Sequence, residues 1–338
     1  MFSMLASGFT AARFGLRASL LPALILTTLA LGSAVFAPGY AFLTAVMLAA
    51  GIGEGILEGL ATPFTQELHR HEDVGRYLNF THSFWSVGVL LATIGAGLML
   101  FWQISWQKVL MITAAAALPG IILLAIPSPL EQQRLNAKNG QSSKAVLLNA
   151  VEIFKSGRFW LFFAAIFFAG GGEWCLTFWL PSFIRIVHGG SALAASVVIA
   201  LFASGMILGR MFSGVWVPQK HLPKLLIAGG SSAMVLGSCL PFVNNFSGIM
   251  VLVFLCGVAI GPFWPTIQSV CADKVKLDST LIYILLSCAG IPGCGLFTWL
   301  QGMLGDVSWI GLRYGFLLMP FSVGIMTLML AAAFKLRR

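Results

Sequence analysis

The clearest shortage in this 338-residue chain is charge, since only 9% of the residues are charged and 58% are hydrophobic. An average soluble chain has about 25% charged residues, so these side chains cannot cover a soluble core of this size. The six cysteines form no CxxC pair, which argues against a disulfide scaffold and against a zinc ribbon. The 37 glycines follow no three-residue period, which excludes collagen. The composition therefore indicates a polytopic membrane protein.

Several chemical motifs are missing as well. The chain has no GxxxxGK[ST] loop, which excludes an ATP-driven pump for this polypeptide. The HEDV run at His71 does not complete an HExxH motif, so we predict no metal site, no cofactor and no enzyme activity. A membrane-embedded enzyme is still the competing class, and it would need a clustered metal set or a Ser–His or Asp pair within the membrane.

Long apolar runs dominate the chain. A bilayer core of about 30 Å requires roughly 20 apolar residues in a helix, and lipid leaves no alternative partner for backbone hydrogen bonds. The first twelve residues are apolar but too short to span. The sequence predicts an all-α membrane protein with ten complete helices, at 18–37, 41–66, 80–101, 107–127, 159–184, 191–217, 222–243, 247–271, 279–304 and 312–334.

The positions of the basic residues predict the orientation. With Arg13–Arg17 taken as cytoplasmic, seventeen of the twenty Lys and Arg residues fall on that side, and only Lys108, Arg185 and Arg313 fall on the other. This bias predicts a multi-pass protein of the cytoplasmic (inner) membrane with a cytoplasmic C-terminus. The net charge of +9 then reflects topology, so nucleic acid is not an expected partner.

A polar stretch divides the chain into three parts. We expect an N-terminal transmembrane half at 1–127, a cytoplasmic central loop at 128–157 and a C-terminal transmembrane half at 158–338. The segment from Gly209, GRMFSGVWVPQKHLPKLL, is comparable with the opening MFSMLASGFTAARFGLRASLL, which suggests an internal repeat. Aligning Gly8 with Gly214 makes the first segment a half-helix.

Two motifs resemble the major facilitator superfamily. GFTAARFGLR is similar to the gating loop after the second helix of those transporters, and GRMFSG is similar to its counterpart after helix 8. The resemblance implies two pseudo-symmetric six-helix halves, of which this chain holds helices 2–6, with helix 2 incomplete, and helices 7–12. It also implies that helix 1 and most of helix 2 are absent. The implied gating-loop residues are Gly8, Arg13, Gly15, Arg17, Gly209, Arg210 and Gly214.

Four further stretches narrow the resemblance. LEGLATPF, YLNFTHSFWSVG, GGGEWCLTFWLPSF and GVAIGPFWPTIQS resemble, in order, helices 4, 5, 7 and 10 of the fucose and glucose/galactose permease branch of sugar:proton symporters. In that branch the helix 4 glutamate is implicated in proton coupling, a role that falls on Glu58 here. Thr62 and Trp85 depart from the branch pattern, which argues against fucose itself.

Polar and aromatic residues within the predicted spans are the candidates for the functional site. Charges at mid-membrane are costly and usually face a cavity, so Glu58 and Glu173 are the candidate proton-coupling carboxylates, with Glu54 read as nearer the outer mouth. Sugars stack on aromatic rings and bind amides through their hydroxyls. For each member of the set below, core packing is the competing interpretation. The candidate substrate-binding residues are Thr62, Asn79, His82, Trp85, Trp174, Trp264, Gln268 and Tyr283.

The expected function is secondary active transport by alternating access. The solute would be small and polar, a sugar or a sugar-like compound, and transport would be coupled to protons. We expect a monomer in the lipid bilayer. Two alternatives stay open, a truncated remnant that does not transport and a major facilitator exporter of another solute class. The identity of the solute does not follow from the sequence.

The topology gives a first testable prediction. Reporter proteins fused after Gly140 and after Arg338 should both report a cytoplasmic location, because the charge bias places the central loop and the C-terminus on one side. Alkaline phosphatase and green fluorescent protein fusions make complementary reporters. Opposite locations for the two positions would contradict the predicted topology.

Overall fold

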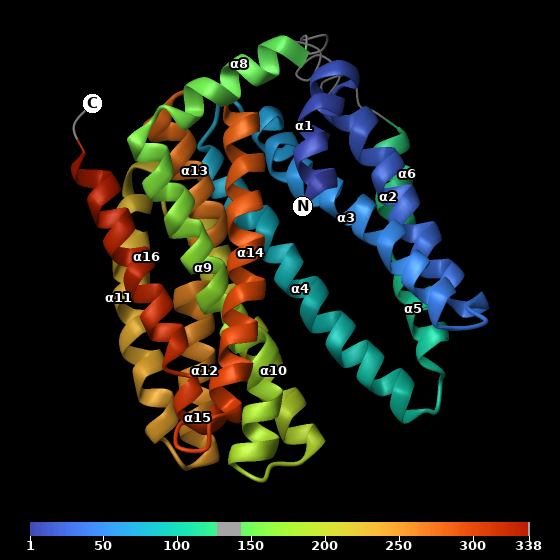
Figure 1. The fold of residues 1–338 in the computed structure, drawn as a ribbon, viewed down its shortest axis with the longest axis vertical. Helices are drawn as coiled ribbons and strands as arrows, with labels where there is room; N and C mark the ends of the chain where they lie inside the picture. Colours follow the sequence, from blue (N-terminus) through green and yellow to red (C-terminus); the bar gives the residue numbers. More distant parts are fainter. Residues whose placement is uncertain (127–142, 337–338) are drawn as a thin grey trace. The chain divides into compact units, whose positions relative to one another are not determined.

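The computed structural model describes residues 1–126 and 143–336, and the described chain folds into helices joined by turns, with no strand among these residues (Figure 1). The first group of helices comprises α1 (Phe2–Phe14), α2 (Leu16–Ser33), α3 (Tyr40–Leu68), α4 (Val74–Phe101), α5 (Trp106–Ala115) and α6 (Leu118–Ala125). The second comprises α8 (Ser143–Phe154), α9 (Gly157–Ser182), α10 (Ala192–Trp216), α11 (Leu222–Cys239), α12 (Phe246–Ile260), α13 (Phe263–Val275), α14 (Ser279–Asp306), α15 (Gly311–Gly315) and α16 (Leu318–Lys335).

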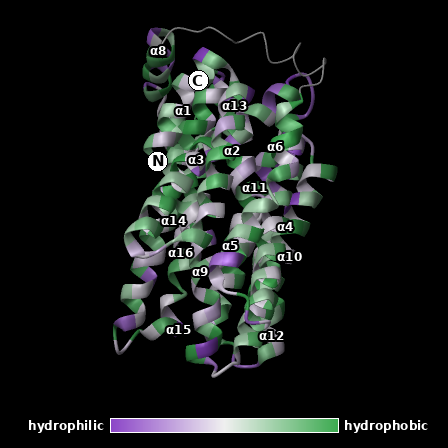
Figure 2. Cartoon of the chain, turned by 90° about the vertical axis from the view of Figure 1, so that its right-hand side faces the viewer, coloured by the Kyte–Doolittle hydropathy of each residue, from purple (hydrophilic) through white to green (hydrophobic). Residues whose placement is uncertain are grey.

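Ten stretches of the described chain are long and apolar enough to cross a membrane, which confirms the predicted number. Each predicted span overlaps one of them, and the observed stretches are Leu16–Phe36, Tyr40–Leu68, Val74–Phe101, Trp106–Ala125, Gly157–Val187, Ala192–Trp216, Gln219–Phe242, Phe246–Val275, Ser279–Asp306 and Gly311–Lys335. The short helix α1 precedes them, as the predicted half-helix required. Hydrophobic residues cover the middle of the helices, and hydrophilic residues lie mostly near their ends (Figure 2).

Glycine and proline set several of the helix boundaries. Gly15 separates α1 from α2 with a φ of 92°, a left-handed backbone conformation that glycine adopts without the penalty of a Cβ atom. Pro262 separates α12 from α13, because proline has no N–H to donate to a helix continuing through it. The break within this span therefore follows from a residue that is visible in the sequence.

The described chain divides into two compact units. Unit 1 consists of Met1–Arg70, Ile94–Ile153 and Leu277–Cys288, and unit 2 consists of His71–Thr93, Phe154–Lys276 and Ala289–Arg338. The units differ from the two predicted halves in that the first part of α4 belongs to unit 2 and the first part of α14 belongs to unit 1. Both of these helices therefore contribute residues to each unit.

Within unit 1, α3 packs closely on α1 and α2. A Cβ atom at Gly53 would lie 2.6 Å from the carbonyl oxygen of Ala23 in α2, and one at Gly59 would lie 2.7 Å from the hydroxyl of Ser7 in α1. The helix backbones can approach this closely only because both positions lack a side chain. By contrast, nothing lies within 4 Å of a Cβ atom at Gly51, so this glycine of the same run has no packing role of that kind.

Within unit 2, α10 and α12 interlock through glycines of both helices. Cβ atoms at Gly205 and Gly209 would collide with the carbonyl oxygens of Phe254 and Val258, and one at Gly257 would collide with the carbonyl oxygen of Phe202. Small residues of this kind let two helices pack at backbone distance. The glycine at 209 is therefore a packing residue in this structure.

Part of the predicted central loop is helical. Residues 143–154 form α8, which begins with the polar Ser143 and Lys144 and buries Val146 and Ile153. An apolar face that recurs at helical spacing explains why this stretch does not remain an open loop. The rest of the predicted loop up to 142, including Gly140, and the last two residues, including Arg338, lie outside the described residues.

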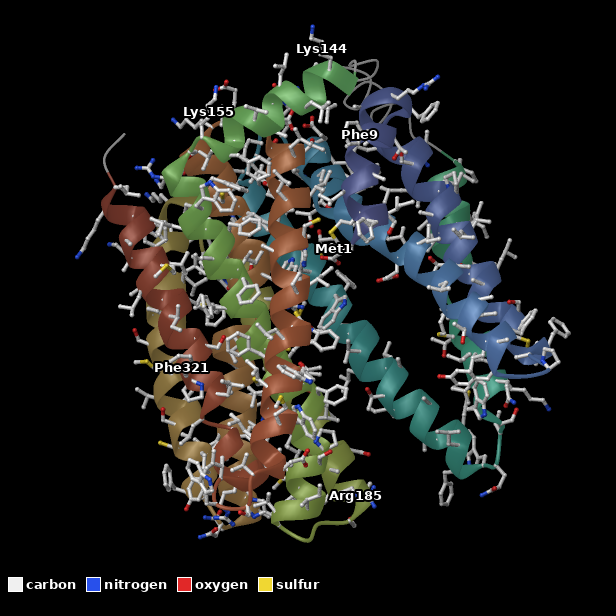
Figure 3. All side chains as sticks on the ribbon, in the orientation of Figure 1. Met1, Phe9, Lys144, Lys155, Arg185 and Phe321 are labelled. Carbon is white, nitrogen blue, oxygen red and sulfur yellow. The ribbon has the colours of Figure 1, made fainter. Side chains whose placement is uncertain are left out.

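Two basic residues mark the ends of unit 2. Lys155 lies at one end of this unit and Arg185 at the other, with Phe321 between them (Figure 3). The charge rule placed Lys155 on the cytoplasmic side and Arg185 on the opposite side, and this orientation stays a prediction.

The glycine contact between α10 and α12 leads to a prediction about stability. Gly209→Ala should destabilise the protein by about 1–3 kcal/mol, because the added methyl group meets the Val258 backbone rather than a flexible side chain. Gly295→Ala in α14 is the matched control, since nothing lies within 4 Å of a Cβ atom there. Thermal unfolding in detergent should show a lower midpoint for the first variant only. Equal midpoints would contradict the packing role of Gly209.

Candidate functional site

Arg210 is the centre of a polar cluster in unit 2. It lies inside α10, within the span predicted at 191–217, and is only 2% exposed, so the segment that resembles a gating loop is helical here. The helix continues to Trp216 because the segment ILGRMFSGVW is apolar apart from the arginine and a serine.

The guanidinium of Arg210 reaches three other parts of the chain. Its Nε donates to the carbonyl oxygen of Gly261 at 2.7 Å, at the end of α12. Its Nη1 donates to the carbonyl oxygen of His82 at 3.1 Å and to the hydroxyl of Ser86 at 2.8 Å, both in α4. Its Nη2 lies 3.7 Å from Oε1 of Glu173 in α9. We call these residues, together with Trp85, the Arg210 cluster.

Glu173 provides the negative charge of the cluster. It lies near the middle of the Gly157–Val187 span and is 5% exposed. The three preceding glycines bring α9 close to its neighbours, since Cβ atoms at Gly170 and Gly171 would meet α14 and one at Gly172 would meet Val323 of α16. A buried ion pair is stable only when each charge keeps its partner, so removing either side chain alone is expected to be costly.

Trp85 covers the guanidinium from the α4 side. The centre of the Arg210 guanidinium lies 5.3 Å from the centroid of the indole ring, a cation–π distance. The ring is nevertheless 42% exposed, unlike the arginine beneath it. The exposed part of the cluster is therefore the aromatic ring of Trp85, while its charged side chains are buried.

A second set of contacts holds the first part of α4 against the rest of unit 2. The Asn79 amide donates to the Thr266 hydroxyl at 3.0 Å and accepts from it at 3.2 Å, and it also donates to the Gly75 carbonyl. The backbone N–H of Gly75 donates to Gln219 Oε1 at 3.0 Å, and Arg76 donates to the carbonyl oxygens of Gly214 and Val215. These contacts connect α4 with α10, α13 and the turn at 219–221.

Glu58 lies in unit 1. Its side chain is half-buried on α3, and the Ser287 hydroxyl of α14 donates to Oε1 at 3.4 Å. Tyr283 is 1% exposed and lies one helical turn before Ser287 in α14. Glu54, on the same face of α3, is exposed.

The other predicted binding residues occupy varied environments. Thr62 and Gln268 are buried, at 3% and 0% exposed, and Trp174 is 37% exposed. Trp264 packs so closely against α14 that a Cβ atom at Gly290 would collide with its ring. Of the aromatic candidates, only Trp85 shares the Arg210 cluster. The binding roles of all these residues stay predictions.

The first predicted gating motif has a different structure from the second. Gly8 is buried in α1, Gly15 forms the turn, and Arg17 donates to the carbonyl oxygens of Leu123 and Leu124, both at 2.7 Å. Arg13 is exposed and lies 5.2 Å above the ring of Phe14. Gly214, from the second motif, packs against the backbone of Phe80. The gating role itself stays a prediction.

The hydroxyl groups of Ser86, Thr266 and Ser287 are among the contacts that the sequence did not predict. Ser86 follows Asn79 and His82 at helical spacing, which is a usable signal, whereas Thr266 and Ser287 carry no signal that separates them from other membrane hydroxyls. No group of three or more His, Cys, Asp or Glu side chains in the described ranges is placed to hold a metal ion.

Ten stretches of the described chain can span a membrane, and two of them bring the buried Arg210 and Glu173 together. These features define a polytopic helical membrane protein. The sequence matches the model of the Major Facilitator Superfamily over residues 1–294. The chain therefore belongs to the major facilitator superfamily, and it is a transporter of that family with structural similarity to sugar:proton symporters. No curated protein is significantly similar to this sequence.

Solved structures share this fold along almost the whole chain. A crystal structure of the E. coli fucose:proton symporter FucP has a TM-score of 0.80 at 18% identity, with 98% of this chain and 87% of that chain covered. The proton:xylose symporter XylE has a TM-score of 0.73 at 15% identity, covering 98% and 82%. The human organic anion transporter MFSD10 (TETRAN) has a TM-score of 0.71 at 15% identity, covering 97% and 82%. Identities this low establish the fold alone.

The contact between Asn79 and Thr266 can be tested by a double-mutant cycle. Asn79→Ala and Thr266→Val should each destabilise the protein, and the double variant should lose less than the sum of the two, with a coupling energy of about 0.5–1.5 kcal/mol. Unfolding midpoints of the four proteins in detergent measure the coupling. Strictly additive losses would show that the two side chains do not interact.

Proposed function

We propose that this transporter carries a small uncharged polar solute, a sugar or a sugar-like compound, together with protons, by alternating access. Among the known structures of this fold, a fucose:proton symporter and a proton:xylose symporter are both similar to it along 98% of the chain. The observation that carries the proposal is the half-buried Glu58 carboxylate in the membrane span and its hydroxyl partner, Ser287.

Glu58 is suited to take up and release a proton. A hydroxyl can donate to an ionised carboxylate and can accept from a protonated carboxyl group, so Ser287 offers a partner to both protonation states. A carboxylate within a membrane span is costly while charged, and protonation removes that cost. Protonation and closure of the transport path can therefore be linked thermodynamically through this one side chain.

Glu173 is less suited to the same role. It pairs with the Arg210 guanidinium at 3.7 Å, so taking up a proton there would also discharge a buried ion pair. This pairing favours Glu58 over Glu173 as the coupling carboxylate, although the sequence pattern named both. In the proposed function Glu173 has the role of counter-ion to Arg210.

Trp85 supplies the apolar surface that a sugar requires. The C–H faces of a sugar ring are apolar and pack on exposed aromatic rings, while the hydroxyl groups take polar partners nearby. Trp85 combines an exposed ring with the polar backbone and side chains of α4 around it. The charge of Arg210 is balanced by Glu173, which suits an uncharged solute better than an anion.

Uptake by the purified chain in liposomes tests the proposal. With acid outside, radiolabelled neutral monosaccharides, including fucose, xylose, glucose and galactose, should accumulate against their gradient. Glu58→Gln, which imitates the protonated carboxyl group, should abolish this accumulation and still allow exchange of labelled for unlabelled sugar. The physical reason is that exchange needs no net proton movement.

Glu54→Gln is the matched control, because Glu54 lies one helical turn away on α3 and is exposed. It should retain most of the pH-driven accumulation. If Glu58→Gln accumulates sugar as well as the unaltered chain does, Glu58 is not the coupling residue. If no monosaccharide enters under any gradient while an organic anion does, the proposed solute class is wrong.

A further inference from the structure

We propose that Arg210 is a positioning residue of the transport site, which holds the indole of Trp85 in place through contacts that converge from α4, α9 and the end of α12. This inference rests on the proposed function only for its transport measurements, since the contact between Arg210 and Trp85 is a property of the protein without solute. All the residues involved belong to unit 2.

The contacts of Arg210 explain why an arginine is needed. A guanidinium is planar and carries five N–H donors in a fixed fork, so one side chain can donate in several directions at once. Here Nε is used by Gly261, Nη1 by His82 and Ser86, and Nη2 faces Glu173. A lysine keeps the charge but has a single nitrogen, which cannot occupy all of these directions.

Burial decides how Arg210 acts. The arginine is 2% exposed and Glu173 is 5% exposed, whereas Trp85 is 42% exposed. Of these three side chains, the indole is therefore the one that a solute can touch. Arg210 acts through Trp85 and is not itself the surface on which a solute binds.

The α4 side of the cluster is held at two neighbouring positions. Arg210 donates to the carbonyl oxygen of His82 and to the hydroxyl of Ser86, which bracket Trp85 in the sequence, and it lies 5.3 Å from the Trp85 ring. The guanidinium thus fixes both the helix that carries the tryptophan and one face of its ring. Such preorganisation lowers the entropy lost when a solute stacks on the ring.

Two variants test this role, with a matched control. Arg210→Lys and Ser86→Ala should raise the KM for sugar uptake, by about fivefold to twentyfold in the lysine variant, with little change in kcat. Ser83→Ala is the control, because Ser83 lies in the same helix and is equally buried, at 1% exposed, but its hydroxyl donates to the carbonyl oxygen of Phe80 within that helix. That variant should keep the KM of the unaltered chain.

A spectroscopic measurement tests the contact without any solute. The full chain labelled with 5-fluorotryptophan should give one ¹⁹F resonance that disappears in Trp85→Phe and so identifies Trp85. In Arg210→Lys this resonance should shift and change width while those of distant tryptophans stay in place. Ser86→Ala should move it in the same sense and by less, and Ser83→Ala should leave it unchanged.

If the lysine variant does not fold, a double variant replaces it. Arg210→Gln combined with Glu173→Gln removes both charges, so neither is left unpaired. An unchanged Trp85 resonance in the folded Arg210 variant and in Ser86→Ala would overturn the proposal. A shifted resonance with unaltered KM would also overturn it, because the held ring would then not serve binding. If the unaltered chain transports no sugar, the proposed function fails, and the resonance still decides whether Arg210 holds Trp85.

Discussion

A permanent positive charge inside a membrane-spanning helix constrains everything around it. Arg210 cannot lose its proton, and a guanidinium left unpaired in a membrane interior costs several kcal/mol, on the order of the penalty for any buried ion. The chain meets this constraint with a carboxylate from α9, a hydroxyl and a carbonyl oxygen from α4 and a carbonyl oxygen from the end of α12. Four segments distant in sequence therefore meet at one point in unit 2.

Close helix packing makes the convergence possible. Gly205 and Gly209 let α10 approach α12 until a side chain would meet backbone, and Gly170 does the same between α9 and α14. Lipid offers no hydrophobic gain for burying one apolar helix against another, so close contact and interhelical hydrogen bonds must hold the bundle together. The polar cluster therefore depends on the glycines, because the hydrogen bonds of Arg210 require helix backbones at short distance.

The two candidate proton-coupling carboxylates, Glu58 and Glu173, illustrate how environment separates roles. Glu58 meets a hydroxyl, which accommodates both of its protonation states, while Glu173 meets a guanidinium, which stabilises the ionised state. Both glutamates look alike in the sequence, as acidic residues in glycine-rich apolar runs. Their partners come from other helices, α14 and α10, so local sequence could not distinguish a coupling residue from a counter-ion.

The sequence alone determined the spans, their number and the all-helical class. A bilayer requires about 20 apolar residues per helix and internal backbone hydrogen bonding, and local composition shows whether a segment meets both requirements. It also pointed to Glu58, Glu173, His82 and Trp85 as residues worth attention. It read 143–154 as part of a loop, since a short amphipathic segment is ambiguous locally. Only the tertiary structure decided the partners of Arg210 and Asn79, because hydrogen bonds between helices depend on which faces meet, and that is set by packing across the whole chain.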